Sequence, residues 1–343
     1  MNHTIPKTMR AVLLTAYNRL ELREIPVPVP AKNEVLCKIK AVAICGSDPQ
    51  IIRGERPREW PQNFPHILGH EWAGEVVALG EGVTDFQIGD RVAGEAHSGC
   101  GYCKNCLSGN YTICLNYGKP ETGARHYGFN FNGANCEYNA YTTKSIHKIP
   151  DSLSFEHASL SDICGVAMHC IELVGVTPSG TVAVIGPGPA GVAAMQIVKG
   201  LGAANAIMIG RGSRLQNAVR IGVDYAVDIN EEDPVEAVRR ITNGFGVDEV
   251  FECSGASVAP VQAVKMVKRG GRIGLIGHYH DTELKFPNLV DLISNEISIH
   301  GSRANPGVSE KVISMISRGI IKGDTLVTHR FPLEQYEEAL DVF

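Results

Sequence analysis

Three residues in the first quarter of the chain combine the side-chain types that bind zinc. Cys45 supplies a thiol, and His70 and Glu71 supply an imidazole and a carboxylate. These are the three ligand types that zinc accepts, and an open zinc site has three protein ligands and a further position for water or substrate. A single cysteine is more often a buried apolar residue, so the pattern gains weight only from the motifs that follow it.

A second group of cysteines lies within a short stretch of chain. Their spacing is C-x2-C-x2-C-x7-C, and the residues are Cys100, Cys103, Cys106 and Cys114. Four thiolates at this spacing are able to surround one tetrahedral ion and leave no open position, which predicts a structural zinc site. A redox motif is disfavoured because the βαβ context is missing, and disulfides are disfavoured because we expect a reducing compartment.

A glycine-rich turn between a strand and a helix indicates a nucleotide site. The apolar run 181–185 predicts a buried strand, residues 192–201 predict a helix, and between them lies G-x-G-x-x-G, formed by Gly186, Pro187, Gly188, Pro189, Ala190 and Gly191. In this context the pattern is the dinucleotide fingerprint. Its first glycine makes the turn, the second admits the pyrophosphate, and the third lets helix and strand pack, while the helix N-terminus attracts the anion.

The residues after the next predicted strand bear on the choice of nucleotide. An NAD site has an acid about 20 residues after the glycines, where it binds the ribose hydroxyls. At this place the chain has no acid and instead carries Gly210, Arg211, Gly212, Ser213 and Arg214. Two guanidinium groups and a hydroxyl suit a 2′-phosphate, so NADP is favoured over NAD. Arginines that follow a strand are also common as solvated surface residues.

The patterning of apolar residues divides the chain into two regions that position these motifs. Before residue 150, short strands are expected at 9–14, 34–42, 75–79 and 90–93, of which 34–42 alternates as a half-buried strand. Their spacing predicts a compact, barrel-like β domain. From a helix expected at 157–174 onward, apolar strands alternate with helices up to a strand at 297–300, which predicts a doubly wound parallel sheet.

Composition and charge exclude several classes of function. The chain has 343 residues, a formal net charge of -5 and 44% hydrophobic residues, which is ordinary for a globular protein of two domains. It has no cluster of basic residues and no apolar run of membrane-spanning length, so neither nucleic acid nor membrane binding is expected. The N-terminal residues lack an apolar signal core, so we expect a cytoplasmic protein.

Taken together, these motifs resemble the zinc-dependent medium-chain dehydrogenases, and within them the sorbitol (polyol) and L-threonine dehydrogenases. Gly69-His70-Glu71, Gly89-Asp90-Arg91-Val92, the four cysteines and the fingerprint stand in the order and spacing of that family across nearly the whole chain. The resemblance implies an α/β protein with a GroES-like β-barrel catalytic domain at 1–153 and 303–343. It implies a Rossmann domain at 154–302 that binds the dinucleotide.

The resemblance also implies roles for individual residues. Cys45, His70 and Glu71 would bind a catalytic zinc, with Asp162 as a ligand or a water-bridged contact. The alternative for Asp162 is a solvated acid beside a helix. Two further residues match the family motif. Ser47 would supply the hydroxyl that relays the substrate proton, and Asp48 would be the acid that orients the histidine.

At some positions the chain departs from the family or matches it less closely. Gln50 occupies the place of a proton-relay histidine, and an amide does not accept and release a proton as imidazole does. Arg303 falls near a position that polyol dehydrogenases use for substrate hydroxyls. Glu95 and His97 resemble the threonine branch and would line the pocket. An anionic substrate group would be served by Arg58, Arg125 or Arg303, all of which would otherwise be solvated.

The leading hypothesis is therefore an enzyme with two zinc ions per chain that transfers a hydride between a secondary alcohol and NAD(P). Candidate substrates are a polyol, a sugar alcohol or its phosphate, with L-threonine or another amino alcohol as the alternative. Homodimers or homotetramers are usual in the family. A hypothesis of another class is a zinc-stabilised, nucleotide-binding sensor without turnover. A zinc-ribbon module for nucleic acid is disfavoured by the acidic composition and by the fingerprint.

Overall fold

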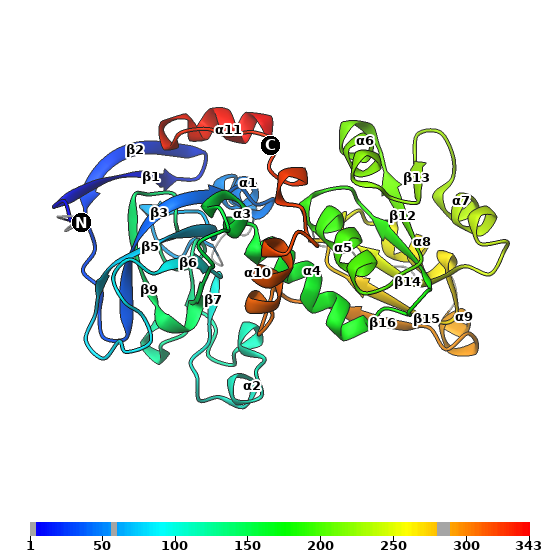
Figure 1. Ribbon diagram of the computed structural model, residues 1–343, viewed down its shortest axis with the longest axis horizontal. Coiled ribbons are helices and arrows are strands. Elements are labelled where there is room, and N and C mark those ends of the chain that lie inside the picture. Colours follow the sequence, from blue (N-terminus) through cyan, green and yellow to red (C-terminus); the bar gives the residue numbers. More distant parts are fainter. Residues whose placement is uncertain (1–4, 56–59, 280–288) are drawn as a thin grey trace. The chain divides into compact units, whose positions relative to one another are not determined.

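The computed structural model describes residues 5–55, 60–279 and 289–343, and the chain divides by its own contacts into two compact units (Figure 1). Unit 1 comprises residues 1–162, 309–317 and 327–343, and unit 2 comprises 163–308 and 318–326. The C-terminal part of the chain thus belongs to both units. The domain limits expected from the sequence, 1–153 with 303–343 and 154–302, stay a prediction.

Unit 1 is built on β-sheets. In the described part of the chain a five-stranded sheet has the order β10-β6-β5-β3-β9, and a three-stranded sheet has the order β2-β1-β4. The strands are β1 (Thr8–Ala16), β2 (Arg19–Pro26), β3 (Glu34–Ala43), β4 (His66–Ile67), β5 (Glu71–Leu79), β6 (Arg91–Gly94), β9 (Tyr138–Thr142) and β10 (Ile146–Lys148). A further pair is formed by β7 (His97–Ser98) and β8 (Arg125–His126).

The core of the larger sheet contains stacked aromatic rings. Trp72 and Tyr141 are fully buried, and their ring centroids lie 4.1 Å apart. Residues 34–43 form the expected strand, but the expected alternation of burial is wrong. Val35, Leu36 and Cys37 are all buried because the register with β5 shifts at Leu36/Cys37, so that successive side chains are enclosed.

Helices of unit 1 connect the sheets and close their edges. They are α1 (Ser47–Ile52), α2 (Lys104–Leu107), α3 (Phe155–Ser159), α10 (Ser309–Ser317) and α11 (Tyr336–Val342), with short 3-10 turns at Tyr111–Ile113, Pro120–Thr122, Thr143–Ser145 and Leu333–Gln335. From the C-terminal end of the chain, Tyr336 and Leu340 pack with Val12 and Leu14 of β1 (Figure 1). The helix expected at 157–174 is divided at Leu160, where α3 ends and α4 (Ser161–Val174) begins.

Unit 2 contains a parallel six-stranded sheet in the described part of the chain, in the order β13-β12-β11-β14-β15-β16. The strands are β11 (Thr181–Ile185), β12 (Asn205–Gly210), β13 (Tyr225–Asp228), β14 (Val247–Glu252), β15 (Val267–Leu275) and β16 (Ser298–Gly301). The order reverses between β11 and β14, as the doubly wound prediction requires, and the predicted fold class is confirmed.

Helices cover both faces of this sheet. They are α5 (Pro189–Gly200), α6 (Gly212–Ile221), α7 (Pro234–Ile241), α8 (Ala259–Met266) and α9 (Leu289–Ser294), and a 3-10 turn lies at Gly323–Thr325 (Figure 1). One face is filled by Ala183, Ile207 and Val250 packed against residues of α7 and α8. Gly191 of α5 approaches Val184 on the other face. No helix among the described residues is long and apolar enough to cross a lipid bilayer.

The stability of unit 1 should depend on pH through one buried histidine. Burial lowers the pKa of His66 in β4 to about 4, and a hydrogen bond with the backbone of Gly128 opposes this only in part. In the unfolded chain this histidine has a pKa near 6.5. The free energy of unfolding therefore decreases as the pH falls from about 6.5 to about 4. The loss should reach about 3 kcal/mol.

His66→Gln removes the titrating group and should flatten this part of the pH profile. The measurement is the difference in unfolding free energy between the two proteins at a series of pH values, with equal metal content. The same slope in both proteins would show that His66 is not the titrating group.

Candidate functional site

Antiparallel pairing brings the three predicted zinc ligands of the first motif together. Ala43 near the end of β3 pairs with Glu71 at the start of β5, so Cys45 just beyond β3 meets the His70-Glu71 pair. The Sγ atom of Cys45, a ring nitrogen of His70 and a carboxylate oxygen of Glu71 lie within 4.8 Å of one another. Residues far apart in the sequence therefore converge on one point in unit 1.

Gly69 allows the chain to reach this point. Its φ is +88°, and a Cβ atom there would lie 2.4 Å from Oδ1 of Asn135. Any other residue would be strained in the left-handed region and would collide with that side chain. The glycine in Gly69-His70-Glu71 is therefore required by the backbone that carries the ligands.

The ligand cluster is buried and dominated by acidic groups. His70 and Glu71 are buried, and burial, Cys45 and Asp162 raise the pKa of Glu71 well above its ordinary value, opposed by His70. Burial and Asp48 likewise raise the pKa of the Cys45 thiol to about 11. A half-buried thiol and a buried carboxyl group that resist ionisation are stabilised in their charged forms by a cation between them, so the donor set fits a zinc ion.

Asp48 and Ser47 lie beside this cluster at the start of α1. Oδ2 of Asp48 accepts a hydrogen bond of 3.0 Å from the Cys45 N–H, and its Oδ1 lies 3.8 Å from Nδ1 of His70. Three atoms are buried without a hydrogen-bond partner among the described residues, and these are Oδ1 of Asp48, Nδ1 of His70 and Oγ of Ser47. Asp48 is thus placed to orient the imidazole ring, as the carboxylate behind a metal-binding histidine does.

Asp162 lies close to the cluster but is not part of the close group of possible ligands in the described residues. It is 5% exposed, stands in the first turn of α4, and its Oδ1 accepts a hydrogen bond of 3.2 Å from the N–H of Ala96. The predicted alternative of a solvated acid is therefore wrong. Its electrostatic effect on Glu71 places the carboxyl group near the site.

The four cysteines also converge. The sulfur atoms of Cys100, Cys103, Cys106 and Cys114 lie within 4.8 Å of one another, and none of the ten cysteines of the chain is in a disulfide. Four sulfurs at this separation match the closed ligand set of a structural zinc site.

Asn116 was not predicted from the sequence, yet it contacts two of these sulfurs. Its Nδ2 donates to Sγ of Cys100 at 3.3 Å, and its backbone N–H donates to Sγ of Cys114 at 3.4 Å. Burial raises the pKa of Cys100, but the N–H donors of Tyr102 and Asn116 outweigh it and lower that pKa to about 6. Such donors stabilise thiolates, the form that binds a metal.

A stack of rings extends from His70 toward a pocket. The His70 ring lies 4.7 Å from Phe129, Phe129 lies 3.8 Å from His126, and His126 lies 3.9 Å from His97, measured between ring centroids. Nδ1 of His126 is hydrogen-bonded to the hydroxyl of Tyr117. The sequence analysis did not predict this stack. The one hint of it in the sequence is the cluster of ring-bearing residues between 126 and 131.

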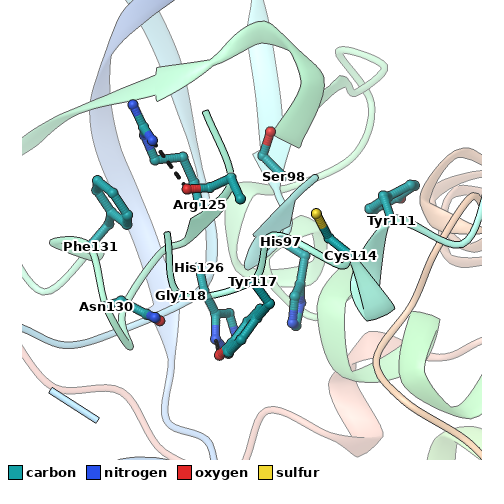
Figure 2. A pocket seen from close by; sticks show the side chains of 11 residues that line it. His97, Ser98, Tyr111, Cys114, Tyr117, Gly118, Arg125, His126, Asn130 and Phe131 are labelled. Carbon is teal, nitrogen blue, oxygen red and sulfur yellow. Dashed lines mark hydrogen bonds between the residues drawn. The ribbon is translucent and has the colours of Figure 1, made fainter. Parts of the chain in front are cut away.

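The pocket beyond the stack has polar walls. Figure 2 shows His126 and Tyr117 side by side with His97 near them. Other lining residues are Ser98, Tyr111, Cys114, Gly118, Ala124, Arg125, Asn130 and Phe131. His97 therefore lines this pocket, and its place in a substrate pocket stays a prediction.

Glu95 does not line this pocket. Its carboxylate accepts a hydrogen bond of 2.6 Å from the hydroxyl of Ser309 and lies 3.4 Å from Nε2 of His147. The expected place of Glu95 in a substrate pocket stays a prediction.

The remaining residues predicted near the substrate are dispersed. Arg125 is half-buried, lies over the ring of Phe131 at 4.4 Å and donates to the carbonyl groups of Pro120 and Ala124, and its role stays a prediction. Arg303 belongs to unit 2, after β16, and its role stays a prediction. Gln50 lies on α1 next to the site, and Arg58 lies outside the described residues.

In unit 2 the glycine-rich turn has the geometry expected of a nucleotide fingerprint. Gly186 has φ +98° after β11, and Gly188 is the N-cap of α5, with Pro189 and Ala190 in the first turn. A Cβ atom on Gly191 would lie 1.9 Å from the carbonyl oxygen of Gly186, whereas one on Gly188 would meet nothing within 4 Å. The open space at Gly188 lies where backbone N–H groups face an incoming anion.

Arg211, Ser213 and Arg214 are exposed at the carboxyl end of β12 and the start of α6. Gly210 pairs in register with Asp228 at the end of β13, and the sequence analysis missed this acid. Oδ1 of Asp228 accepts a hydrogen bond of 2.9 Å from the N–H of Asn230. Both arginines thus face solvent at the strand end where an adenosine ribose is recognised in this fold.

Comparison with known proteins places the chain in a family. Residues 31–151 match the family described as alcohol dehydrogenase GroES-like domain, and residues 189–318 match the zinc-binding dehydrogenase family. The chain is 34% identical to the sorbitol dehydrogenase of Bacillus subtilis (strain 168), an alignment that covers 99% of this chain and 95% of the relative. It is 34% identical to the L-threonine 3-dehydrogenase of Thermococcus kodakarensis, with coverage of 97% and 94%.

A solved structure shares the fold over nearly its full length. The zinc-binding dehydrogenase of Sinorhizobium meliloti 1021 bound to NADP superposes with a TM-score of 0.90 and 28% sequence identity, covering 98% of this chain and 96% of that chain. The chain therefore belongs to the zinc-binding alcohol dehydrogenases. It is an oxidoreductase with a GroES-like domain and a Rossmann-like domain, and the predicted family and enzyme class are confirmed.

The fingerprint geometry predicts that two similar substitutions differ in their effect on the stability of unit 2. Gly191→Ala would place a methyl group against the carbonyl oxygen of Gly186 and should destabilise unit 2 by about 1–3 kcal/mol. Gly188→Ala has space and ordinary backbone angles, so its melting temperature should equal that of the parent. Thermal melting of both variants without nucleotide tests this, and equal Tm values for the two variants would contradict the close approach.

Proposed function

We propose that the chain oxidises a secondary hydroxyl group of a polyol, with zinc bound by Cys45, His70 and Glu71 and with NADP as the hydride acceptor. The observation that carries the metal assignment is the convergence of a thiol, an imidazole and a carboxyl group within 4.8 Å. The burial of His70 and Glu71 and the raised pKa values of Cys45 and Glu71 support a cation at this point. Unit 1 would be the catalytic domain and unit 2 the nucleotide domain.

The neighbouring residues would have distinct roles in the reaction. A zinc ion bound here would supply Lewis acidity that lowers the pKa of the alcohol. Asp48 would hold the His70 ring, and Ser47, whose hydroxyl is buried beside the ligands, would receive the alcohol proton. The amide of Gln50 does not relay a proton, so the proton would pass from Ser47 to water or to the nucleotide ribose. Asp162 would be a water-bridged contact.

The four-cysteine lobe would hold a second zinc ion with a structural role. The N–H donors of Asn116 that lower the pKa of Cys100 support this, because they favour the thiolate ligand. A closed site of four thiolates stabilises the fold of its own segment and offers no position to a substrate. The proposed content is therefore two zinc ions per chain, one catalytic and one structural.

A polyol is favoured over a simple alcohol by the named activities of similar proteins. The similarity to a sorbitol dehydrogenase supports the same class. L-threonine is the second candidate, because a relative of equal identity is an L-threonine 3-dehydrogenase and His97 resembles that branch.

NADP is proposed on the strength of the strand end after β12. Arg211 and Arg214 are exposed where the adenosine ribose is recognised, and no acid stands between them. A related dehydrogenase structure contains NADP. We further propose a homodimer or homotetramer in the cytoplasm, as the resemblance implies.

Metal content and turnover should separate the two zinc sites. The parent should contain two zinc ions per chain and should reduce NADP with a polyol. Cys45→Ser should lose one ion and all turnover but keep its melting temperature within a few degrees. Cys103→Ser should lose the other ion and melt lower, because structural zinc contributes folding energy.

The measurements are elemental analysis, thermal melting and a substrate panel of polyols, sugar alcohol phosphates, hydroxy acids and L-threonine, each with NAD and NADP. Full activity in a sample that lacks the metal bound by Cys45 would refute the zinc mechanism. Nucleotide binding without turnover on any alcohol would favour the sensor hypothesis.

Replacing the two arginines should change the nucleotide preference. Arg211→Ser with Arg214→Ser should raise the KM for NADP by roughly tenfold or more and leave the KM for NAD nearly unchanged, because each charged hydrogen bond to a phosphate contributes about 1.5–3 kcal/mol. Arg220→Ser, an exposed arginine at the other end of α6, is the matched control. Equal effects on both nucleotides would remove the NADP assignment.

A further inference from the structure

Glu252 is a fully buried acid at the carboxyl end of β14, in the middle of the parallel sheet. Its Oε1 accepts hydrogen bonds from the N–H groups of Ser254 at 2.7 Å and Gly255 at 3.1 Å, and from the Ser254 hydroxyl. Its Oε2 accepts a longer bond of 3.3 Å from Gly255 N–H and a bond from the hydroxyl of Tyr279. The backbone N–H groups can only donate, so both carboxyl oxygens of Glu252 serve as acceptors.

The donors come from two loops that leave the same edge of the sheet. Ser254 and Gly255 follow β14, and Tyr279 follows β15. The backbone strengthens the link, because the N–H groups of Ile276 and Gly277 donate to the carbonyl oxygen of Glu252 at 2.8 and 3.0 Å. A Cβ atom on Gly277 would lie 2.3 Å from Oε2 of Glu252, so the second loop packs directly on the carboxylate.

This cluster touches the nucleotide fingerprint. The N–H of Cys253 donates to the carbonyl oxygen of Ile185 at 2.8 Å, and a Cβ atom on Gly186 would lie 2.8 Å from the backbone nitrogen of Ser254. β11 and β14 are the neighbours between which the strand order reverses. A dinucleotide lies across this point, with one mononucleotide on each half of the sheet.

The two halves can be assigned to the two ends of the nucleotide. Arg211 lies after β12 on the half formed by β11, β12 and β13, which takes the adenosine ribose. The half formed by β14, β15 and β16 is left for the nicotinamide. Glu252 therefore lies beneath the nicotinamide end, and none of the ion pairs among the described residues includes it.

We propose that Glu252 is a positioning residue for the nicotinamide end of the nucleotide, which joins the loops after β14 and β15, and that its negative charge favours the oxidised cofactor over the reduced one. The oxidised nicotinamide ring carries a positive charge that hydride transfer removes. A fixed carboxylate beneath it stabilises the charged ring in a site of low dielectric constant. This inference rests on the proposed binding of a nicotinamide nucleotide.

The test compares two buried acids of the same strand. Glu252→Gln removes the charge and offers the donors a poorer acceptor, whereas Glu249→Gln makes the same change earlier in β14, where Glu249 is bound by Arg272 and Thr177. Dissociation constants for NADP+ and NADPH are measured by calorimetry on the whole, metal-loaded protein. If the parent protein binds NAD+ and NADH more tightly than NADP+ and NADPH, the dissociation constants are measured for NAD+ and NADH instead.

Glu252→Gln should weaken binding of the oxidised nucleotide relative to the reduced one by about threefold or more, and Glu249→Gln should leave that ratio unchanged. An unchanged ratio in a folded Glu252→Gln variant overturns the charge effect. A parent protein that binds neither nucleotide form defeats the proposed function itself, so the two failures are distinguishable.

A second variant tests the proposal if the Glu252→Gln protein does not fold. Tyr279→Phe removes one donor and keeps the carboxylate, and burial and Glu252 raise the pKa of Tyr279, so the parent side chain is the protonated donor. This variant should weaken both nucleotide forms by the same factor of about three to ten and keep their ratio. Unchanged dissociation constants for both forms would show that the link between the two loops does not position the nucleotide.

Discussion

The antiparallel pairing of β3 with β5 is the constraint on which the metal site depends. It places the segment after Ala43 against Glu71 and so assembles a thiol, an imidazole and a carboxyl group from separate parts of the chain. Asp48 and Asp162 add further acidic groups, and burial makes their joint ionisation unfavourable without a cation. Burial that destabilises the free acids favours a doubly charged ion among them, which is the basis of the proposed zinc site.

Buried acidic side chains have different surroundings in the two units. In unit 1 the acids converge on one point and face one another, which suits a metal. In unit 2 the buried carboxylates of Glu249 and Glu252 are each surrounded by donors, through Arg272 and Thr177 in one case and through loop N–H groups and hydroxyls in the other. Several donors that converge on one carboxyl group fix the segments that supply them.

The ring stack gives unit 1 a wall between metal site and pocket. Phe129 separates His70 from His126, and His126 is held by Tyr117, which in turn accepts a hydrogen bond of 3.0 Å from Nε1 of Trp60. A change in any of these rings would be transmitted to the imidazole by packing, because interiors are dense and tolerate little change in volume.

Much of the protein was predictable because its signals are local. Cys100 to Cys114, the turn from Gly186 to Gly191 and the alternation of apolar strands with helices are readable within short windows, since spacing alone sets what the backbone can place together. The pairing of Cys45 with His70 needed the family resemblance as well. Only the tertiary structure decided the contacts between distant segments. It closed Ser309 over Glu95, bonded Asp162 to Ala96, stacked His97 on His126 and joined Tyr279 to Glu252. These depend on strand register and on how the C-terminal segments return to the sheets, and no local pattern encodes either.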